Sequence, residues 1–424
     1  MDYSKRLLHK NTFVAMRLLC VLFLLSCEKP NVEPTKPQNP NSEPKASVDG
    51  YLQVSPEGQF VRDGKPYYGI GINYFDAFFR LMRNNNTSYT QGFEVLKKNN
   101  IPFIRFTLLG FWPNDLNNKY LNDKEGFYRK FDRFIADAEK YGIGLIPSFF
   151  WNSTAVCDVV GEHTNQWENP DSKTIALMKQ CTDEIVKRYK DKKIIWAWEF
   201  SNEINIYVDP MGRTDDNHKW MYVNQVNVAE GTPAQRTLAD SLSTDGLRLG
   251  LKEFSAIIRK YDPDRAILSG NGMSHQGIYR RYTTKKWSGS DSPAEYTLAC
   301  DLHNPSYVGT ITIHPYPHNE NAGYFQNPSN TFDDIIRETM RSAKELKRPL
   351  FVGEFGVDTS FGANEATKFN EYLSAILAHK VQLAALWVFD YSLQNGSWNI
   401  TDTNPRKYQL EAIGKANTEF QKNR

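Results

Sequence analysis

The sequence predicts an α/β protein built as one (β/α)8 barrel, a TIM barrel with an N-terminal β-hairpin and long loops after its strands. Eight short apolar runs recur along residues 50–424, and amphipathic stretches with helical spacing lie between most of them. No Gly-rich dinucleotide-binding motif follows the first run. Apolar strands that alternate with helices predict a parallel sheet covered on both faces, and eight such units favour a barrel over an open doubly wound sheet.

Residues 1–27 have the composition of a signal peptide. Basic residues precede a short apolar run at 18–27 that is too short to span a membrane as a stable helix. The run ends in "LLSC", which resembles a bacterial lipobox, so we expect cleavage to leave Cys27 as a lipidated N-terminus. The alternative is an ordinary secretory signal with an incidental cysteine. Translation from Met16 would give a signal of the usual length.

Residues 28–49 are rich in Pro, Asn, Glu and Lys and contain almost nothing that can be buried. This composition predicts an extended, disordered tether. We therefore expect an exported lipoprotein of the bacterial cell envelope, periplasmic or surface-exposed. Its contact with the membrane would be the lipid on Cys27 alone.

Residues 50–424 are expected to form the barrel domain. It opens with a hairpin whose turn is Asp63-Gly64. The predicted strands lie in residues 67–75, 101–109, 142–151, 193–200, 265–270, 308–316, 349–357 and 383–391. Residues 126–142 illustrate the helices between them, with one apolar stripe formed by Phe127, Phe131, Phe134, Ile135 and Ala138.

Charge and cysteine content exclude several functional classes. The net charge of +2 comes from 51 basic and 49 acidic residues without long blocks, so we expect neither nucleic-acid binding nor a polybasic membrane patch. Beyond the signal, Cys157, Cys181 and Cys300 have no metal-ligand spacing and are expected to be inert thiols. The histidines are scattered, so we expect no metal. We also expect no organic cofactor and a monomer.

Polar residues at the ends of the predicted strands are the candidate site, because barrel enzymes build their sites at the carboxyl ends of the strands. The residues concerned are Asn73, Arg105, Asn202, Glu203, His314, Tyr316, Glu354 and Trp387. Two carboxyl groups on one rim are what a retaining glycosidase requires. One protonates the leaving oxygen and the other attacks the anomeric carbon, at a separation of about 5 to 5.5 Å.

The neighbouring side chains provide the environments that these roles need. An apolar, aromatic rim and a second carboxylate raise the pKa of an acid. Arg105 and the hydroxyl of Tyr316 are expected to keep the nucleophile ionised. His314 and Asn202 are hydrogen-bond donors, Asn202 towards a sugar 2-OH. Trp387 offers an apolar face on which a sugar ring stacks.

Four motifs in order, "WEFSNE", "ITIHPYP", "FVGEFG" and "ALWVFDY", resemble those of the clan A glycoside hydrolases, and most of all glycoside hydrolase family 5, the cellulase family. The resemblance covers about residues 50–420. It implies that Glu203 is the acid/base and Glu354 the nucleophile of a retaining enzyme that cleaves a β-linked polysaccharide or oligosaccharide of mannan or glucan type. Arg105, Asn202, His314, Tyr316 and Trp387 match the family's other active-site positions.

The chain departs from the family pattern in three places. Ile204 stands where a proline usually follows the Asn-Glu pair. The third strand lacks the histidine that many members carry, which leaves Trp151 or Asn152 as the candidate for that position. The segments after Glu203 to residue 245 and at 271–307 are long for such loops. The sugar, and endo or exo action, are therefore left open.

Several residues have alternative interpretations. Glu199 lies four residues before Glu203 and is expected to be a structural hydrogen-bond partner. Four loop tryptophans are either sugar platforms or local packing, and they are Trp112, Trp151, Trp167 and Trp398. Glu162 and His163 are expected to be solvated. A catalytically silent glycan-binding lipoprotein, or a transglycosylase, is the alternative to a hydrolase.

Overall fold

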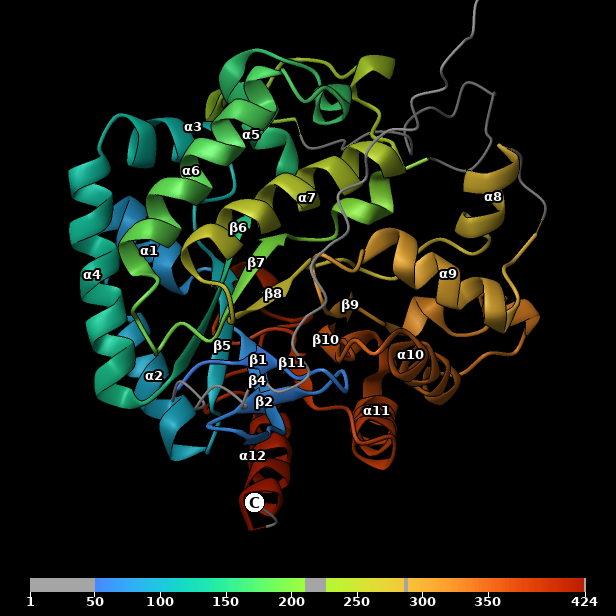
Figure 1. Cartoon of the computed structure of the whole chain (residues 1–424). Coiled ribbons are helices and arrows are strands. Elements are labelled where there is room, and N and C mark those ends of the chain that lie inside the picture. Colours follow the sequence, from blue (N-terminus) through green and yellow to red (C-terminus); the bar gives the residue numbers. More distant parts are fainter. Residues whose placement is uncertain (1–49, 210–225, 286–288, 423–424) are drawn as a thin grey trace, which may run out of the picture. The chain divides into compact units, whose positions relative to one another are not determined.

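The computed structural model describes residues 50–209, 226–285 and 289–422 (Figure 1). The predicted signal with Cys27, the predicted tether and part of the long loop after Glu203 lie outside the described residues. Within the described ranges, no helix is long and apolar enough to cross a membrane.

The predicted barrel is confirmed. Eight parallel strands follow one another in the order β8-β7-β6-β5-β4-β11-β10-β9. Seven of them lie within the predicted apolar runs, and the fourth extends one residue past its run, to Ser201. Their bounds are β4 Gly69–Asn73, β5 Phe103–Thr107, β6 Gly144–Phe150, β7 Ala197–Ser201, β8 Ala266–Leu268, β9 Ile311–Ile313, β10 Leu350–Phe355 and β11 Leu383–Leu386. Figure 1 shows these strands at the centre, with helices around them.

Helices connect the strands and cover the outer face of the sheet. They are α1 Ala77–Asn84, α2 Tyr89–Lys98, α3 Pro113–Asp115, α4 Lys124–Tyr141, α5 Ser153–Val160, α6 Lys173–Tyr189, α7 Thr244–Tyr261, α8 Ile278–Thr284, α9 Pro293–His303, α10 Phe332–Leu346, α11 Glu365–Ala378 and α12 Lys407–Lys422. The predicted apolar stripe of α4 is buried. Asp123 caps the start of this helix by accepting from Gly126 N, and Gly142 ends it in the left-handed conformation.

The predicted N-terminal hairpin lies at the end of the barrel where its strands begin. Strands β2 (Phe60–Arg62) and β3 (Lys65–Pro66) pair antiparallel, and β1 (Gln53–Val54) pairs with β2. Asp63 and Gly64 both have positive φ, as a two-residue hairpin turn requires. Leu52 N donates to Trp196 O at 3.0 Å, so the segment before the hairpin is hydrogen-bonded to the start of the fourth barrel strand.

Side chains complete the barrel between its two end strands. The described strands β8 and β9 share no backbone ladder. Instead, Thr310 Oγ1 donates to Ile267 O at 2.6 Å. Asn304 Oδ1 accepts from Thr312 N at 3.1 Å and from the Ser269 hydroxyl at 2.6 Å. This nearly closed barrel brings the carboxyl ends of all eight strands to one face.

Candidate active site

A cavity of about 390 Å³ lies at the carboxyl ends of the strands. Polar and aromatic side chains share its surface. Its lining comprises Phe75, Phe111, Trp151, Asn152, Ser153, Asn202, Glu203, Tyr207, Tyr316, His318, Glu354, Trp387, Tyr391, Gln394 and Trp398. Both predicted carboxyl groups are therefore in one cavity.

Glu354 is directed towards this cavity by an irregularity in β10. The register of β10 against β11 shifts between Val352 and Phe355, so a bulge there changes the direction of the intervening side chains. The bulge carbonyl of Gly353 accepts from Asn73 Nδ2 at 2.9 Å. A Cβ on Gly353 would lie 2.6 Å from His314 Nε2, so glycine is needed here for the histidine to pack.

Two strong donors hold the carboxyl group of Glu354. Arg105 Nη1 donates to its Oε1 at 2.8 Å, and the Tyr316 hydroxyl donates to its Oε2 at 2.7 Å. The side chain of Glu354 is only 5% exposed. Charge-assisted hydrogen bonds of this length stabilise the ionised carboxylate.

Arg105 lies below the cavity and organises the residues around it. Its guanidinium is completely buried and faces the Trp151 ring at 4.4 Å. Besides Glu354, it donates from Nε to Glu199 Oε1 at 2.7 Å and from Nη2 to Asn202 Oδ1 at 2.8 Å. The interpretation of Glu199 as a structural hydrogen-bond partner is thereby confirmed. Because its oxygen faces Arg105, Asn202 retains its amide N–H groups as donors for the cavity.

Asn73 also belongs to this buried layer. Its Oδ1 accepts from Arg105 Nη1 at 3.0 Å, while its Nδ2 donates to the bulge of β10. The side chain is fully buried and does not line the cavity. Asn73 therefore fixes Arg105 and Glu354 in place and is not positioned to touch a ligand.

Glu203 leaves β7 in a different environment. Its φ is 51°, in the left-handed region, which costs a non-glycine residue about 1 to 3 kcal/mol. The backbone N–H donates to Gly270 O at 2.8 Å, which offsets part of that cost. His314 Nδ1 lies 3.1 Å from Glu203 Oε1, and the side chain is 27% exposed.

The two carboxyl groups are close to one another but electrostatically distinct. Oxygens of Glu203 and Glu354 lie within 4.8 Å. Burial raises the pKa of Glu203, and the positive charge of Arg105 opposes that rise only in part. Burial and the neighbouring Glu203 raise the pKa of Glu354, against the opposing effects of Arg105 and the Tyr316 hydroxyl. Their hydrogen bonds differ: Glu354 accepts from Arg105 and from the Tyr316 hydroxyl, whereas the described partner of Glu203 is His314.

Burial also fixes the protonation states of the two side chains after β9. It lowers the pKa of His314 to about 3, so this imidazole is neutral at neutral pH. Burial and the adjacent Glu354 raise the pKa of Tyr316 far above its ordinary value, so its hydroxyl keeps its proton. His314 lies beneath the cavity lining at 2% exposure, whereas Tyr316 reaches the surface of the cavity.

Aromatic rings form much of the remaining wall. The ring centroids of Trp151 and Trp387 are 6.1 Å apart, and Phe75 packs edge-on against Trp151 at 5.0 Å. The indole N–H of Trp387 donates to Gln394 Oε1 at 3.0 Å, which fixes the plane of this ring. Trp398 packs edge-on against Tyr316. Such a surface suits the apolar faces of sugar rings.

Other nominated residues lie outside the cavity. Trp112 caps α3 and packs against Phe111 at 4.8 Å, and it does not line the cavity. Trp167 is completely buried and packs against Phe200, so it contributes to the core. His163 is half-exposed and lies 3.1 Å from Asp240 Oδ1, while Glu162 accepts hydrogen bonds from Thr174 at the start of α6.

Sequence analysis missed several lining residues. They are Phe75, Phe111, Ser153, Tyr207, His318, Tyr391 and Gln394. Phe75 and Tyr391 end predicted strands, so the strand-end argument could have found them. The others lie in loops, where periodicity gives no information about side-chain direction.

One group of described residues has the composition of a possible metal site. Ligand atoms of Glu203, His314 and Glu354 lie within 4.8 Å of one another. Arg105 Nη1, however, already occupies a position 2.8 Å from Glu354 Oε1, where its charge would repel a cation. The donor set fits proton transfer and nucleophilic attack better than metal binding. The expected absence of a metal or organic cofactor stays a prediction.

Comparisons with known proteins identify relatives of the chain. Residues 63–392 match the Cellulase family (glycosyl hydrolase family 5). The chain is 24% identical over 401 residues to mannan endo-1,4-beta-mannosidase 3 of Arabidopsis thaliana, which covers 84% of this chain and 85% of the relative.

Solved structures share its fold. An endo-1,4-beta-mannanase from Rhizomucor miehei has a TM-score of 0.63 at 19% identity, covering 87% of this chain and 99% of that chain. A beta-glucanase from Saccharophagus degradans has a TM-score of 0.52 at 14% identity, covering 88% of this chain and 94% of that chain. The family match spans well over half of the sequence and both carboxyl groups of the cavity. The chain belongs to glycosyl hydrolase family 5 and is an O-glycosyl hydrolase.

Proposed function

We propose that the protein is an endo-acting β-mannan hydrolase that works by double displacement with retention, with Glu203 as acid/base and Glu354 as nucleophile. The observation that carries this proposal is the carboxylate pair. Its oxygens lie within 4.8 Å, which fits the short separation of retaining glycosidases and not the separation of about 6.5 to 9.5 Å in inverting ones.

In the first step, a carboxylate oxygen of Glu354 attacks the anomeric carbon as the bond to the leaving sugar oxygen breaks. Glu203 gives its proton to that oxygen, and the product is a covalent glycosyl-enzyme. Arg105 and Tyr316 hold the attacking carboxylate in one orientation through its two oxygens. This preorganisation removes the cost of orienting the nucleophile during the reaction.

In the second step, water replaces the leaving sugar. Glu203, now a carboxylate, takes a proton from the water as its oxygen attacks the anomeric carbon. The bond to Glu354 breaks, and the carboxylate returns to its two donors. Two inversions restore the original β-configuration. Partial exposure of Glu203, at 27%, is consistent with access of water to this side chain.

The choice of β-mannan rests on relatives and on cavity chemistry. The Arabidopsis relative is a mannan endo-1,4-beta-mannosidase, and the Rhizomucor structure is that of an endo-1,4-beta-mannanase. The aromatic cavity wall suits a neutral sugar chain. An acceptor sugar in place of water would give transglycosylation, so oligosaccharides longer than the substrate are the product that would reveal this alternative.

The decisive experiment measures release of reducing sugar by residues 50–424 from β-mannan, β-glucan, xyloglucan and xylan. We expect release from β-mannan, with a rapid loss of viscosity that indicates endo cleavage. Glu354→Gln should abolish release while remaining folded, and Glu94→Gln, at an exposed position on α2, should be fully active. Activity of folded Glu354→Gln equal to the parent would overturn the proposed mechanism. Binding of a glycan by the parent without cleavage would instead support the silent glycan-binding alternative.

We also propose that the mature protein is a monomer in the bacterial cell envelope, anchored by lipid on Cys27. The support is the apolar run that stops at this cysteine and the polar segment that follows. Mass spectrometry of the mature N-terminal peptide should find an acylated Cys27, and Cys27→Ser should release the protein from the membrane fraction. An unacylated N-terminus at another residue would contradict the anchor. Light scattering on residues 50–424 measures the molar mass in solution and tests whether the protein is a monomer.

A further inference from the structure

We propose that Asn152 is a further substrate-binding residue, whose Nδ2 donates a hydrogen bond to a sugar hydroxyl next to the scissile bond. This inference rests on the proposed function and adds a specificity determinant to the same cavity. It explains an otherwise costly feature, a buried amide donor that has no acceptor among the described residues.

The register of two strands places Asn152 beside the acid/base. Phe150 of β6 pairs with Ser201 of β7. Asn152 and Glu203 each follow their strand by two residues, so they leave the barrel at the same end of adjacent strands. Both line the cavity. A ring linked through the oxygen that Glu203 protonates would therefore lie next to Asn152.

Local hydrogen bonds determine which way the amide of Asn152 points. Its Oδ1 accepts from the Thr154 backbone N–H at 3.2 Å and from the Thr154 hydroxyl at 2.8 Å. A backbone N–H can only donate, so the oxygen of the amide must face Thr154 and the nitrogen must face away. The side chain is 5% exposed, and its Nδ2 has no partner within the described ranges.

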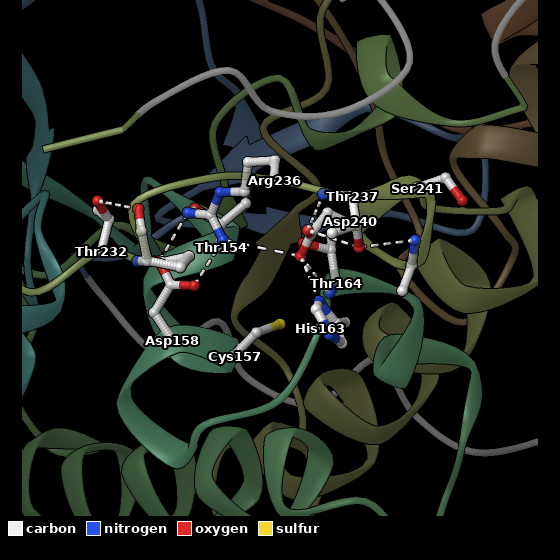
Figure 2. A network of polar contacts seen from close by, with 12 residues as sticks. Thr154, Cys157, Asp158, His163, Thr164, Thr232, Arg236, Thr237, Asp240 and Ser241 are labelled. Atoms are coloured by element: carbon white, nitrogen blue, oxygen red, sulfur yellow. Dashed lines mark hydrogen bonds and ion pairs between the residues drawn. The ribbon is translucent and has the colours of Figure 1, made fainter. Parts of the chain in front are cut away.

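The hydroxyl of Thr154 is itself held by an ion pair (Figure 2). Arg236 lies in the loop before α7, and its Nη1 and Nη2 contact Asp158 Oδ1 and Oδ2 at 2.6 and 2.7 Å. Both partners are 2% exposed. Arg236 Nη2 also lies 3.4 Å from Thr154 Oγ1, as a donor. Because that hydroxyl accepts from Arg236, its single proton is directed to Asn152.

Asp240 provides a second attachment for the same loop. It lies 3.8 Å from Arg236 of the same loop, and its Oδ1 accepts from the Thr164 backbone N–H at 3.4 Å and lies 3.1 Å from His163 Nδ1. Figure 2 shows Arg236 between Asp158 of α5 and Asp240 of the loop. The long loop after Glu203 is thus fastened to the helix that begins beside Asn152. The arrangement keeps the donor fixed without any ligand contact by Arg236 itself.

The expected ligand group is a neutral hydroxyl of a β-linked hexose. A carboxamide N–H donates to a hydroxyl oxygen without a change of charge. The adjacent Trp151 also lines the cavity. A site built to hydrogen-bond a hydroxyl discriminates against a sugar that lacks it, because the buried donor is then left unpaired.

The test uses Glu354→Gln, which should bind without cleavage, and isothermal titration with β-1,4-mannohexaose and β-1,4-glucohexaose. Asn152→Ser keeps the helix cap, since Ser and Asn cap equally well, but it removes the amide N–H donor and leaves only a shorter hydroxyl. We expect Kd for mannohexaose to rise about three- to ten-fold. Ser172→Ala, which removes the matching cap of α6, should lower the unfolding temperature and leave Kd unchanged.

Two further variants test the positioning role of Thr154. Thr154→Val removes the hydroxyl and should raise Kd by about two-fold, because the backbone N–H still orients the amide. Thr154→Ser keeps the hydroxyl and should bind as the parent does. Thr154 does not line the cavity, so neither change removes a direct ligand contact.

The outcomes separate this inference from the proposed function. An unchanged Kd for Asn152→Ser would overturn the role of Asn152 alone. An equal rise for Ser172→Ala would show a structural effect and would also overturn it. If neither hexaose binds to Glu354→Gln and the parent cleaves neither, the proposed function fails, and this inference fails with it.

Discussion

Tyr316→Phe is the substitution that most cleanly isolates the proposed nucleophile. It removes one oxygen atom, whose hydrogen bond to Glu354 Oε2 measures 2.7 Å, and it retains the ring that packs against Trp398. The fold should persist. What changes is the number of donors to the carboxylate, because Arg105 alone then holds it.

The magnitude follows from the charge of the acceptor. A hydrogen bond to an ionised group contributes about 1.5 to 3 kcal/mol, and one pKa unit corresponds to about 1.4 kcal/mol. The Tyr316 hydroxyl opposes the rise that burial causes in the pKa of Glu354. Its loss should therefore raise that pKa by about one to two units. Since the nucleophile works as a carboxylate, the acid limb of kcat/KM should move to higher pH by the same amount.

The assay is the pH dependence of kcat/KM on β-mannan for the parent and for Tyr316→Phe. Tyr391→Phe is the matched control, because Tyr391 lines the same cavity and has no described hydrogen bond to Glu354. We expect the control to keep the acid limb of the parent. An acid limb that stays in place, or that moves to lower pH, in Tyr316→Phe would refute the assignment of Glu354 as the ionised nucleophile held by Tyr316.

Three further substitutions test separate parts of the site. Arg105→Met should lower the free energy of unfolding by about 3 to 5 kcal/mol in urea titrations, because Glu199 is left buried without its cation. Adding Glu199→Gln should recover part of that loss. Strictly additive losses would contradict the coupling between the two residues. Glu203→Gln should lower kcat on mannan by a factor of about 10² to 10⁴. The loss should be smaller on an aryl β-mannoside, whose leaving group needs no proton. Equal losses on both substrates would argue against an acid role for Glu203. Gln394→Ala should lower kcat/KM by about five-fold, because the Trp387 indole loses its hydrogen-bond acceptor. Gln394→Glu keeps an acceptor and should lose less of kcat/KM. An unchanged kcat/KM for Gln394→Ala would contradict the role of Gln394 in orienting Trp387.

The barrel could be predicted from the sequence because its strands are buried on both faces. Each of the eight strands is an apolar run, and each run is separated from the next by a segment long enough for a helix. The exact ends of the strands were harder to predict. Residues 265–270 and 308–316 shorten to the three-residue strands β8 and β9, whose junction depends on side-chain hydrogen bonds such as Thr310 to Ile267.

The candidate site could be predicted where chemistry lies next to a strand end. Glu203, Tyr316 and Trp387 lie one to three residues after the ends of strands, and Glu354 lies near the end of one, so the topology brings them to one face. The bulge that directs Glu354 into the cavity depends on a register shift against β11, which no local pattern encodes.

Loop residues were harder to place. Trp151 and Trp398 line the cavity, whereas Trp112 and Trp167 do not, although all four appeared equivalent in sequence. Their directions are set by tertiary contacts, such as the packing of Trp167 against Phe200. Burial of a loop tryptophan therefore has to be read from the structure.

The central claim is that the carboxylate pair performs a double displacement, and the stereochemistry of the first product tests it most directly. Proton NMR of mannohexaose during cleavage by residues 50–424 resolves the anomeric configuration before mutarotation. The pair of Glu203 and Glu354, with oxygens within 4.8 Å, predicts that the β-anomer appears first and the α-anomer only later. An α-anomer that appears first would mean inversion, and would contradict the nucleophilic role of Glu354.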